Sequence, residues 1–564
     1  MKKFFLIIPL IFGINVSYAQ GINFLWIKNE VNNLSLVKTD IRNYDFVLIT
    51  SSKVTSLSKM LNETIPDSIP VIYFPDASYR DFLIQSFLND GINLQRRFSY
   101  SKNGVTVLGL NYKLNKLLNY SGLLPEDENW LRENLTVNKN PKRLYIVACG
   151  FEKENNLLDI PGSLLPKETY FIFLNTLESK YGKSPVLQVE LKNNSILIKK
   201  KRINNIKLAS YKAAFKNKLE RGISNLKIIQ AKQNNSFTFN PPLIDGNNFY
   251  TTNINGIVSC LDSTGNTIWD YDAMGTIISQ PVILKNFFIF TTLEGDVVIL
   301  DKTSGEQIES LGVDDAIVSG PVLFTYTGNK ELLYSNGSGK TGAVAFATSS
   351  GSIYAYSVPA FEELWVNEDN NSGITGDVIN ANNKIIFFNS KGILHNIDPA
   401  TGWTIWKWQE KSAPAKLISN FLVEMKNLFF VLSNNKLYKM DLLLGKRLWK
   451  IKSGKISGRI AFDYHGNIFF TTSNGLKTVS HKSGKVLKNI KVRENNSGLS
   501  SNLVFSGNDV YFGSKNGKIY RLTNGNKIST VANVKKPVSY TGKKMNNIFT
   551  IIDYFNNFNI INLH

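Results

Sequence analysis

One short phrase occurs in eight copies in the second half of the chain and constrains its fold more than any other feature. The phrase is most complete at residues 396–406, Asn-Ile-Asp-Pro-Ala-Thr-Gly-Trp-Thr-Ile-Trp, and it recurs at 440–449, with shorter or weaker copies at 261–269 and 300–308. A turn residue lies six positions before the aspartate or its equivalent in each copy: Gly256, Gly295, Gly351, Gly392, Asn435, Gly475, Gly517 and Asn557. The spacings are 39, 56, 41, 43, 40, 42 and 40 residues, so a single unit repeats eight times, with one insertion in the third copy.

The repeated unit predicts four short strands. Apolar stretches at 281–284 and 287–290 are followed by a tight turn, where glycine readily adopts positive φ, and by an alternating stretch at 297–300. An Asp-x-x-x-Gly turn, in which the aspartate accepts hydrogen bonds from nearby backbone amides, then begins the fourth strand. Four strands in roughly 40 residues, repeated, are typical of propeller blades. The tryptophan that ends the phrase is expected to fill the space between neighbouring blades.

The phrase resembles the tryptophan-docking repeat of the pyrroloquinoline-quinone (PQQ)-like propeller superfamily, over residues 241–564. The resemblance implies an all-β propeller, and the copy number predicts eight blades. The eighth copy supplies only about three strands before the chain ends. Because an open strand edge promotes aggregation, we expect residues 223–232 to provide the missing strand, which makes 223–564 the propeller domain.

Residues 20–205 have a different character, because short apolar strands alternate there with helical stretches. The expected strands are 23–27, 45–50, 70–74, 105–110, 143–148 and 170–174, and the expected helices are 54–62, 79–89 and 126–135. This alternation indicates an α/β layer architecture. Residues 186–200 predict a hairpin that turns at Asn193-Asn194, and residues 206–222 predict a linker helix.

The order of these segments resembles a calcineurin-like metallophosphoesterase, which implies a sandwich of α and β layers. The family's strand ending in Gly-Asp corresponds to residues 45–51, and its Pro-Val-x-x-x-Pro-Gly-Asn-His-Asp segment corresponds to residues 70–79. Residues 122–132, Gly-Leu-Leu-Pro-Glu-Asp-Glu-Asn-Trp-Leu-Arg, match the family's Gly-x-Leu-x-x-x-Gln-x-x-Trp-Leu segment. The family's later strand ending in a ligand histidine corresponds to residues 144–148, which Cys149 follows.

The ligand positions of that family are replaced in this chain. Thr50-Ser51 stands in the Gly-Asp position and Asp76-Ala77-Ser78-Tyr79 in the Gly-Asn-His-Asp position, and the first histidine in the chain is His395. A two-metal site needs His, Asp and Asn ligands around ions about 3.5–4 Å apart. Residual acids such as Asp76 and Asp81 are better explained as surface carboxylates. The sequence therefore predicts a pseudoenzyme, with no catalytic residue, no metal ligand and no cofactor site.

Residues 1–19 predict a secretory signal peptide. Lys2 and Lys3 precede an apolar run at 4–16, and Ser17-Tyr18-Ala19 fits a cleavage site before Gln20. The run is too short to cross a membrane, and no later stretch approaches the length required. We therefore expect an exported protein without a transmembrane segment in the mature chain, located in the periplasm, at the outer membrane or on the cell surface.

The net charge is +21 and the isoelectric point about 9.5, which raises the question of an anionic partner. The densest basic run, Lys199–Arg202, is interpreted as a solvated linker face, because Asn, Lys and Ile are abundant throughout the chain. Nucleic acid is not an expected partner of an exported protein. The only cysteines, Cys149 and Cys260, are expected to be buried, and the sequence does not decide whether they form a disulfide.

No other catalytic or cofactor-binding motif in the sequence has the spacing that its chemistry requires. The histidines His395, His465, His481 and His564 have no metal-ligand spacing and are expected to be strand or surface residues. The phosphate-loop-like run at 337–342 has the wrong leading spacing and is interpreted as a hairpin tip. Quinoprotein dehydrogenases, as a family, hold their quinone with an adjacent-cysteine disulfide, and no Cys-Cys pair exists here, so no bound quinone is expected.

With no catalytic chemistry predicted in either half, binding remains as the expected role. Exported PQQ-like propellers of this kind resemble the BamB-type scaffold proteins of outer-membrane β-barrel assembly. The resemblance implies a non-catalytic scaffold or adaptor for envelope proteins, among them an outer-membrane β-barrel complex. Residues 403–408 and 446–452 are the expected contact points, whereas Trp406 and Trp449 themselves are expected between blades. The alternatives are a secreted metal-dependent phosphoesterase and a glycan- or peptide-binding propeller.

Overall fold

The computed structural model describes residues 22–28, 44–51, 69–75, 79–88, 95–102, 104–111, 125–137, 143–149, 168–173, 186–192, 195–199, 203–207, 227–232 and 236–562, the last with gaps at 329–341, 371, 412–414, 464, 473–474, 492–498, 507–508, 524–526, 535 and 546–547. The chain divides into two compact units. One comprises Met1–Asp76, Leu94–Tyr112 and Trp130–Asn217, and the other comprises Ala77–Asn93, Lys113–Asn129 and Lys218–His564. The expected signal peptide and the expected helix at 54–62 lie outside the described residues.

The first unit contains two sheets. The six-stranded sheet has the order β10-β9-β8-β1-β2-β3, and the four-stranded sheet has the order β4-β5-β6-β7. Their strands are β1 (Ile22–Lys28), β2 (Phe46–Ser51), β3 (Val71–Pro75), β4 (Arg97–Lys102), β5 (Val105–Asn111), β6 (Arg143–Cys149), β7 (Thr169–Phe173), β8 (Val186–Lys192), β9 (Ser195–Lys199) and β10 (Ile203–Lys207). The β8–β9 hairpin turns between Lys192 and Ser195, at the expected Asn193-Asn194. Two residues of the expected linker helix belong to β10, and the rest of that segment lies outside the described residues.

Apolar side chains from both sheets form one core in the first unit. Phe46 of β2 stands 5.4 Å from Phe98 of β4, and Phe74 of β3 stands 5.5 Å from Phe98, measured between ring centroids. Trp26 and Tyr145 are fully buried in the same cluster. Parallel pairs β1–β2, β2–β3, β5–β6 and β6–β7 make both sheets mixed. The described part of this unit is therefore a two-layer arrangement of sheets, with helix α3 (Pro125–Val137) following β5 in sequence.

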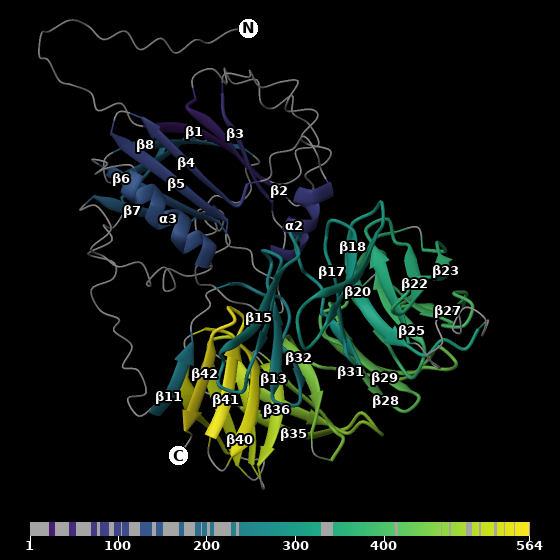
Figure 1. Ribbon diagram of the computed structural model, residues 1–564. Helices are drawn as coiled ribbons and strands as arrows, with labels where there is room; N and C mark the ends of the chain where they lie inside the picture. Colours follow the sequence, from purple (N-terminus) through teal and green to yellow (C-terminus); the bar gives the residue numbers. More distant parts are fainter. Residues whose placement is uncertain are drawn as a thin grey trace, which may run out of the picture. The chain divides into compact units, whose positions relative to one another are not determined.

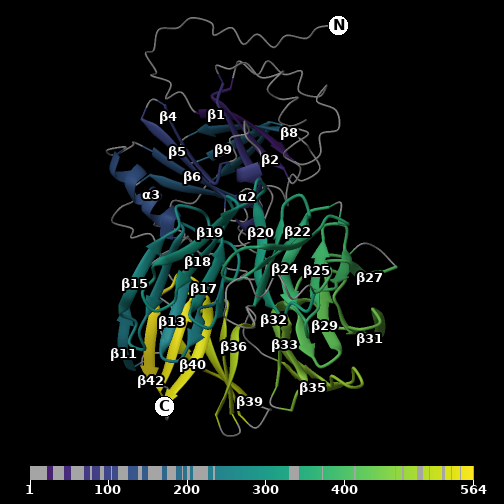
Figure 2. The same cartoon turned by 45° about the vertical axis from the view of Figure 1, so that its right-hand side comes forward.

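The second unit contains eight four-stranded antiparallel sheets, which confirms the expected eight-bladed propeller (Figures 1 and 2). The strands of blades 1–4 are β12 (Leu243–Asp245), β13 (Asn248–Thr252), β14 (Ile257–Leu261), β15 (Thr267–Asp272); β16 (Val282–Leu284), β17 (Phe287–Thr291), β18 (Asp296–Asp301), β19 (Gln307–Gly312); β20 (Ile317–Phe324), β21 (Ala343–Thr348), β22 (Ile353–Ser357), β23 (Glu363–Asn367); and β24 (Ile374–Asn380), β25 (Ile385–Asn389), β26 (Ile393–Ile397), β27 (Thr404–Gln409).

The strands of blades 5–8 are β28 (Leu422–Glu424), β29 (Asn427–Leu432), β30 (Lys436–Asp441), β31 (Lys446–Lys452); β32 (Ile456–Phe462), β33 (Ile468–Thr472), β34 (Gly475–Val479), β35 (Val486–Lys491); β36 (Leu499–Ser506), β37 (Asp509–Ser514), β38 (Lys518–Thr523), β39 (Lys527–Asn533); and β40 (Val538–Met545), β41 (Ile548–Asp553), β42 (Phe558–Asn562), β11 (Lys227–Lys232). The insertion in the third copy lies between β20 and β21. The turn of the eighth copy has its positive φ at Asn556, one residue before the expected Asn557.

The last blade joins the two ends of the propeller sequence. Strand β11, within the segment expected to close the ring, pairs antiparallel with β42 from Lys227↔Asn562 to Lys232↔Phe558. In Figure 1 the yellow C-terminal strands β40–β42 accordingly lie beside teal β11. Eight apolar clusters then connect each blade to the next, and the last cluster joins Phe558 of blade 8 to Phe249 of blade 1. The ring is therefore closed by backbone pairing and by side-chain packing.

The strand order gives the propeller two faces. Turns between the first and second strands and between the third and fourth strands of a blade lie on one face, here called the lower face. Turns between the second and third strands and the connections between blades lie on the upper face. First strands of successive blades contact one another, as β20 contacts β24, so they surround the axis and the fourth strands form the outer rim.

Helix α2 (Tyr79–Leu88) belongs to the propeller unit, although the strands on either side of it in sequence, β3 and β4, belong to the other unit. Its side chains Phe82, Leu83 and Ile84 pack on the upper face. The residues they meet come from blades 8, 1, 2, 3 and 4: Phe555, Ile254, Leu293, Val318 and Ile374. Arg80 donates to the Val318 carbonyl at 2.6 Å and pairs with Asp377 at 3.3 Å. A segment that the sequence places in the N-terminal domain thus covers part of the upper face.

Neither described helix is long and apolar enough to cross a membrane.

Candidate interaction surface on the propeller

The lower-face corners of the blades are shaped by the aspartate of the repeated phrase. In blade 5, Asp441 Oδ1 accepts hydrogen bonds from the backbone amides of Leu443 and Leu444, each at 2.9 Å. The Gly445 amide then donates to the Asp441 carbonyl at 2.9 Å, with φ +65° at Gly445. The same turn in blade 1 gives its aspartate several donors, and hydrogen bonds led by the Thr264 hydroxyl lower the pKa of Asp262 to about 2. These corners are therefore rigid, and side chains at the middle of each turn project outward.

Four tryptophans of the phrase, in blades 1, 3, 4 and 5, connect their blade to the corner of the next blade, as expected. Trp406 Nε1 donates to the Leu442 carbonyl at 3.1 Å, and Trp449 Nε1 donates to the Lys482 carbonyl at 3.2 Å. Trp269 and Trp365 make the same bond to the residue after the aspartate position of the following copy. Because an indole holds the corners of blades 2, 4, 5 and 6 from inside, the outward side chains of these corners stand on a fixed base.

Several large apolar side chains project from these corners into solvent. Trp403 is 77% exposed and Met425 is 83% exposed, and Leu443 and Leu444 are more than half exposed. They lie on adjacent blades, since Trp403 is in the lower corner of blade 4 and the other three are in lower turns of blade 5. We name these four residues the lower apolar patch. Single exposed apolar residues are ordinary on proteins, but a group on neighbouring rigid turns is typical of a binding surface.

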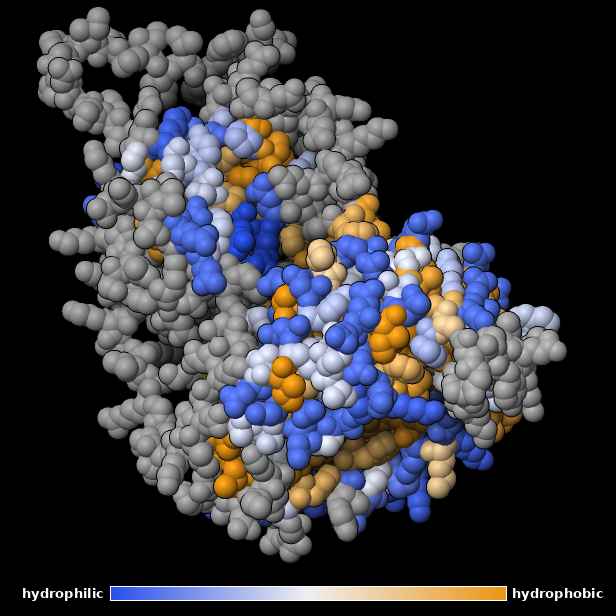
Figure 3. Space-filling view, viewed as in Figure 1, coloured by the Kyte–Doolittle hydropathy of each residue, from blue (hydrophilic) through white to orange (hydrophobic). Residues whose placement is uncertain are grey.

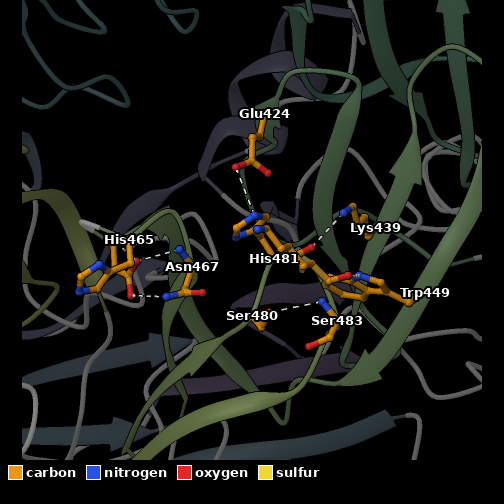
Figure 4. A network of polar contacts seen from close by, with 10 residues as sticks. Glu424, Lys439, Trp449, His465, Asn467, Ser480, His481 and Ser483 are labelled. Atoms are coloured by element: carbon orange, nitrogen blue, oxygen red, sulfur yellow. Dashed lines mark hydrogen bonds and ion pairs between the residues drawn. The ribbon is translucent and has the colours of Figure 1, made fainter.

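A polar network holds the corners of blades 5 and 6 together (Figure 4). Buried Lys439 Nζ donates to the His481 carbonyl at 3.0 Å and lies over the Phe429 ring, and burial lowers the pKa of Lys439. His481 Nε2 stands 3.6 Å from Glu424 Oε1, and the Ser483 amide donates to Ser480 Oγ at 3.3 Å. Figure 4 shows His481 between the labelled Glu424 and Lys439. Lys439 in β30 of blade 5 is therefore joined to the corner of blade 6 at His481.

Glu410 is a buried acid that compensates cations on the outer strand of blade 5. Its carboxylate lies 3.3 Å from Lys450 Nζ and 3.6 Å from an Arg447 nitrogen. Burial by itself would raise the pKa of Glu410, but hydrogen bonds from Tyr438 and Lys450 and the two nearby positive charges outweigh burial and lower it. Lys450 and Arg447 are therefore engaged within the protein.

Several residues at or near the phosphoesterase ligand positions lie within the described part of the chain or just outside it. Thr50 Oγ1 accepts a hydrogen bond from Trp26 Nε1 at 3.0 Å, Asp76 is outside the described residues, and Asp81 is exposed on α2. The described residues contain no group of three or more His, Cys, Asp or Glu side chains suited to a metal ion. Residues 337–341, the basic run 199–202 apart from Lys199, and His564 lie outside the described residues.

The remaining histidines and cysteine take structural positions. His395 of β26 is buried, with its ring stacked 4.7 Å from the Phe387 ring and Nε2 3.2 Å from Asn389 Nδ2. Burial lowers the pKa of His395 to about 4. His465 is exposed in the turn before β33. Cys260 is a buried free thiol, so it is not in a disulfide.

Sequence reasoning named residues 403–408 and 446–452 as contact points, and the structure separates these ranges by exposure. Trp403, Ile405, Lys407 and Leu448 are exposed, whereas Trp406 and Trp449 are half-buried between blades, as expected. Leu443, Leu444 and Met425 were missed. The signal for the two leucines was present in the sequence, because they occupy the middle of an Asp-x-x-x-Gly turn that should face solvent.

The family model described as outer membrane protein assembly factor BamB matches residues 217–310, 238–408 and 349–545. These overlapping matches together cover more than half of the chain. No curated protein matches the chain.

Three solved structures are similar to part of the chain at low sequence identity. BamB from Moraxella catarrhalis is 15% identical, with a TM-score of 0.44, over 60% of this chain and 99% of that one. Sqt1 from Saccharomyces cerevisiae is 13% identical, with a TM-score of 0.48, over 60% of this chain and 99% of that one. A europium-containing methanol dehydrogenase is 11% identical, with a TM-score of 0.45, over 58% of this chain and 84% of that one.

Proposed function

The chain belongs to the family described as outer membrane protein assembly factor BamB, and from this membership we propose that it is a non-catalytic, exported scaffold that binds envelope proteins through its propeller. The partner that the family description favours is an outer-membrane β-barrel complex. A propeller fold alone does not define a function, because the same ring supports enzymes and binding proteins. The proposal therefore needs a protein-binding surface on this chain.

The observation that carries the proposal is the lower apolar patch. Leu443 and Leu444 are exposed on the turn that Asp441 and Trp406 hold, and Trp403 is exposed on the blade 4 corner that Trp365 holds. Met425 is exposed in the neighbouring β28–β29 hairpin. Tryptophan and methionine are enriched in protein interfaces, and a rigid base lowers the entropy lost when a partner binds. A few such anchors usually supply most of the binding energy of an interface.

The test is affinity purification of the tagged protein from gently solubilised envelopes, followed by mass spectrometry. We expect the native chain to recover a β-barrel complex in stoichiometric amount. Trp403→Ser combined with Met425→Ser should reduce recovery at least about tenfold, because interface anchors are worth 2 kcal/mol or more. Ile308→Ser is the matched control, since Ile308 is exposed on the outer strand of blade 2. Recovery of the chain alone, at low salt and after cross-linking, would contradict the scaffold proposal.

For the N-terminal unit we propose a phosphoesterase-like scaffold that has lost its reaction. Support comes from the motif order in residues 45–132 and from the replacement of the ligand positions, with no histidine before His395. The residues present do not fit a two-metal site, because no imidazole ligand is available to it. We expect purified protein to show no hydrolysis of an aryl phosphate with added Mn²⁺ or Zn²⁺. Metal-dependent turnover that is abolished by Asp76→Asn would favour the phosphoesterase alternative instead.

A glycan- or peptide-binding propeller is the remaining alternative. Thermal-shift measurements with envelope glycans separate it from a scaffold. A saturable rise in melting temperature would support this alternative, because a ligand that binds only the native state stabilises it.

A further inference from the structure

Charge is distributed unevenly around the propeller. Residues 241–369, which form blades 1–3, carry 16 acidic and 4 basic residues, whereas residues 370–564 carry 9 acidic and 28 basic residues. The excess of positive charge in the propeller therefore belongs to blades 4–8 alone. A uniform compositional bias does not explain this distribution, because neighbouring copies of one repeat differ in the sign of their charge.

Equivalent positions of the repeat show the change of sign directly. In blade 2 the corner runs Gly305-Glu306-Gln307-Ile308-Glu309, and in blade 6 it runs Gly484-Lys485-Val486-Leu487-Lys488. Both glycines have positive φ, +77° and +72°, so the two corners share a backbone conformation at this point. The first and fourth positions after the glycine are acidic in one blade and basic in the other. The shared backbone needs neither sign, so the lysines of blade 6 are not explained by folding.

The lysines of blades 5 and 6 are interleaved with exposed apolar side chains. The lower outer rim of these two blades consists of the exposed cations Lys446, Lys482, Lys485 and Lys488 and the apolar residues Leu443, Leu444, Leu448, Val486 and Leu487. We name this set the basic apolar rim. Its five apolar side chains are each between 49 and 63% exposed. Figure 3 shows hydrophilic and hydrophobic residues mixed over the face of the propeller that is in view.

The two halves of the basic apolar rim are held next to each other. Trp449, which follows Leu448, donates to the Lys482 carbonyl, and its indole lies against Gly484, where an added Cβ would stand 3.2 Å from the ring. Of the nearby acids, Glu410 pairs with Arg447 and Lys450, and Glu424 Oε1 lies 3.6 Å from His481 Nε2. Among the described residues, none forms an ion pair with the four lysines of the rim.

We propose that the basic apolar rim binds the surface of an anionic lipid membrane. Lysines near such a surface are attracted by the headgroup charge, and apolar side chains between them insert at the boundary of the acyl chains. An acidic protein could form ion pairs with the lysines, but it would not explain the exposed leucine and valine side chains between them. The acidic blades 1–3 would be repelled by the same surface, so the charge asymmetry orients the ring. Leu443 and Leu444 belong to both surfaces, but Lys485 and Lys488 belong to the rim alone and Trp403 and Met425 to the lower apolar patch alone, so variants at these positions test the two contacts separately.

The experiment is vesicle flotation of the full chain. One set of vesicles is phosphatidylcholine, and the other contains one third phosphatidylglycerol. We expect binding only to the anionic vesicles, and we expect Lys485→Glu with Lys488→Glu to lower the partition coefficient at least about tenfold. This variant should fold, because blade 2 carries glutamates at the same two positions. Leu443→Ser with Leu444→Ser, which leaves the charge unchanged, should lower it about threefold or more through lost apolar insertion.

The control is Lys416→Glu with Lys455→Glu, which makes the same change in net charge. Both lysines are exposed in connections on the upper face, next to the same blades. We expect the control to bind within about threefold of the native chain, because a local contact depends on charge within a Debye length. Equal losses in the control and rim variants, or no flotation with anionic vesicles, would overturn the proposal. Rim-dependent binding to polyglutamate without flotation would also overturn it and assign the rim to an acidic protein.

Discussion

The indole of Trp406 lies against Gly445 of the next blade so closely that a Cβ on this glycine would stand 2.6 Å from the ring. The same indole donates its N–H to the carbonyl of Leu442, at 3.1 Å. Gly402 and Gly305 receive Trp365 and Trp269 in the same way, at 2.7 and 2.6 Å. The glycine of the repeated phrase therefore has two tasks, since it adopts positive φ and it leaves room for the preceding blade.

Replacing Gly445 separates these two tasks. We expect Gly445→Ala to lower the free energy of unfolding by about 2–4 kcal/mol, the sum of the backbone cost of positive φ and the cost of overpacking against Trp406. Gly246→Ala is the control. Gly246 likewise has a positive φ, +60°, but a Cβ added to it would have no heavy atom within 4 Å. The control should lose about 1 kcal/mol. Denaturant unfolding measures both, and equal losses would show that Trp406 yields to the added methyl group.

Burial of His395 predicts a pH dependence of stability. Its pKa falls from 6.5 to about 4 on folding, so between these values the unfolded chain binds the proton and the native protein does not. The free energy of unfolding should therefore decrease as pH falls from 6.5 to 4, by up to roughly 3 kcal/mol for this residue. His395→Gln keeps a polar side chain beside Asn389 but cannot titrate. The difference between native and variant stability should shrink on acidification, and a constant difference between pH 7 and 4.5 would contradict the assignment.

Closure of the ring by β11 is expected to contribute a large share of propeller stability. Gln230 pairs with Ile560 and Ala231 pairs with Asn559. Because consecutive residues direct their amides to opposite sides of a strand, prolines at both positions remove at least one ladder hydrogen bond. We expect Gln230→Pro with Ala231→Pro to lower the free energy of unfolding by about 3 kcal/mol and to promote aggregation through the exposed edge of β42. The control places the same pair of prolines at Gln233 and Asn234, which follow Lys232, the last residue of β11, in sequence. Equal stability of the two variants would show that the ring does not need this strand.

Docking of α2 on the upper face depends on its apolar side. Leu83 packs against residues of several blades, whereas Phe87 is exposed at the end of the helix. Leu83→Asp places a charge among apolar groups and should release the helix, since an unpaired buried charge is strongly unfavourable. Hydrogen exchange of residues 79–88 should then accelerate at least about tenfold, with little change in the strands of blades 5–7. Phe87→Asp should leave the exchange near the native rate, and acceleration in both variants would argue against docking through Leu83.

The positions of the blades were predictable because the repeat is a local signal. Spacing, turn residues and strand alternation place the four strands of each copy, and the structure agrees with the expected blade count. In the last copy the positive φ falls at Asn556 in place of the expected Asn557, because positions 556 and 557 both hold asparagine, which tolerates positive φ. In the sixth copy the expected turn residue Gly475 is instead the first residue of β34. The burial of His395 was missed, because alternation alone does not tell a buried polar position from an exposed one when both faces of a blade are covered.

The candidate surfaces were predictable only in part. The sequence indicated residues 403–408 and 446–452 but not that Met425 joins Trp403 on one face, because these residues meet through two different turns of successive blades. It also did not indicate that α2 packs on the propeller, because its neighbours in sequence, β3 and β4, belong to the other unit. Contacts of this kind join residues far apart in the chain, and a propensity for helix or strand carries no information about them.

By itself, the sequence determined the propeller, its eight units and the role of the Asp-x-x-x-Gly turn, because each of these depends on residues within a few positions of one another. The tertiary structure decided which side chains of a turn face solvent, which cations are compensated by Glu410, and which corners lie side by side through Trp449 and Lys439. The physical reason is that exposure and charge pairing depend on the next blade, about 40 residues away, and are settled only when the ring closes.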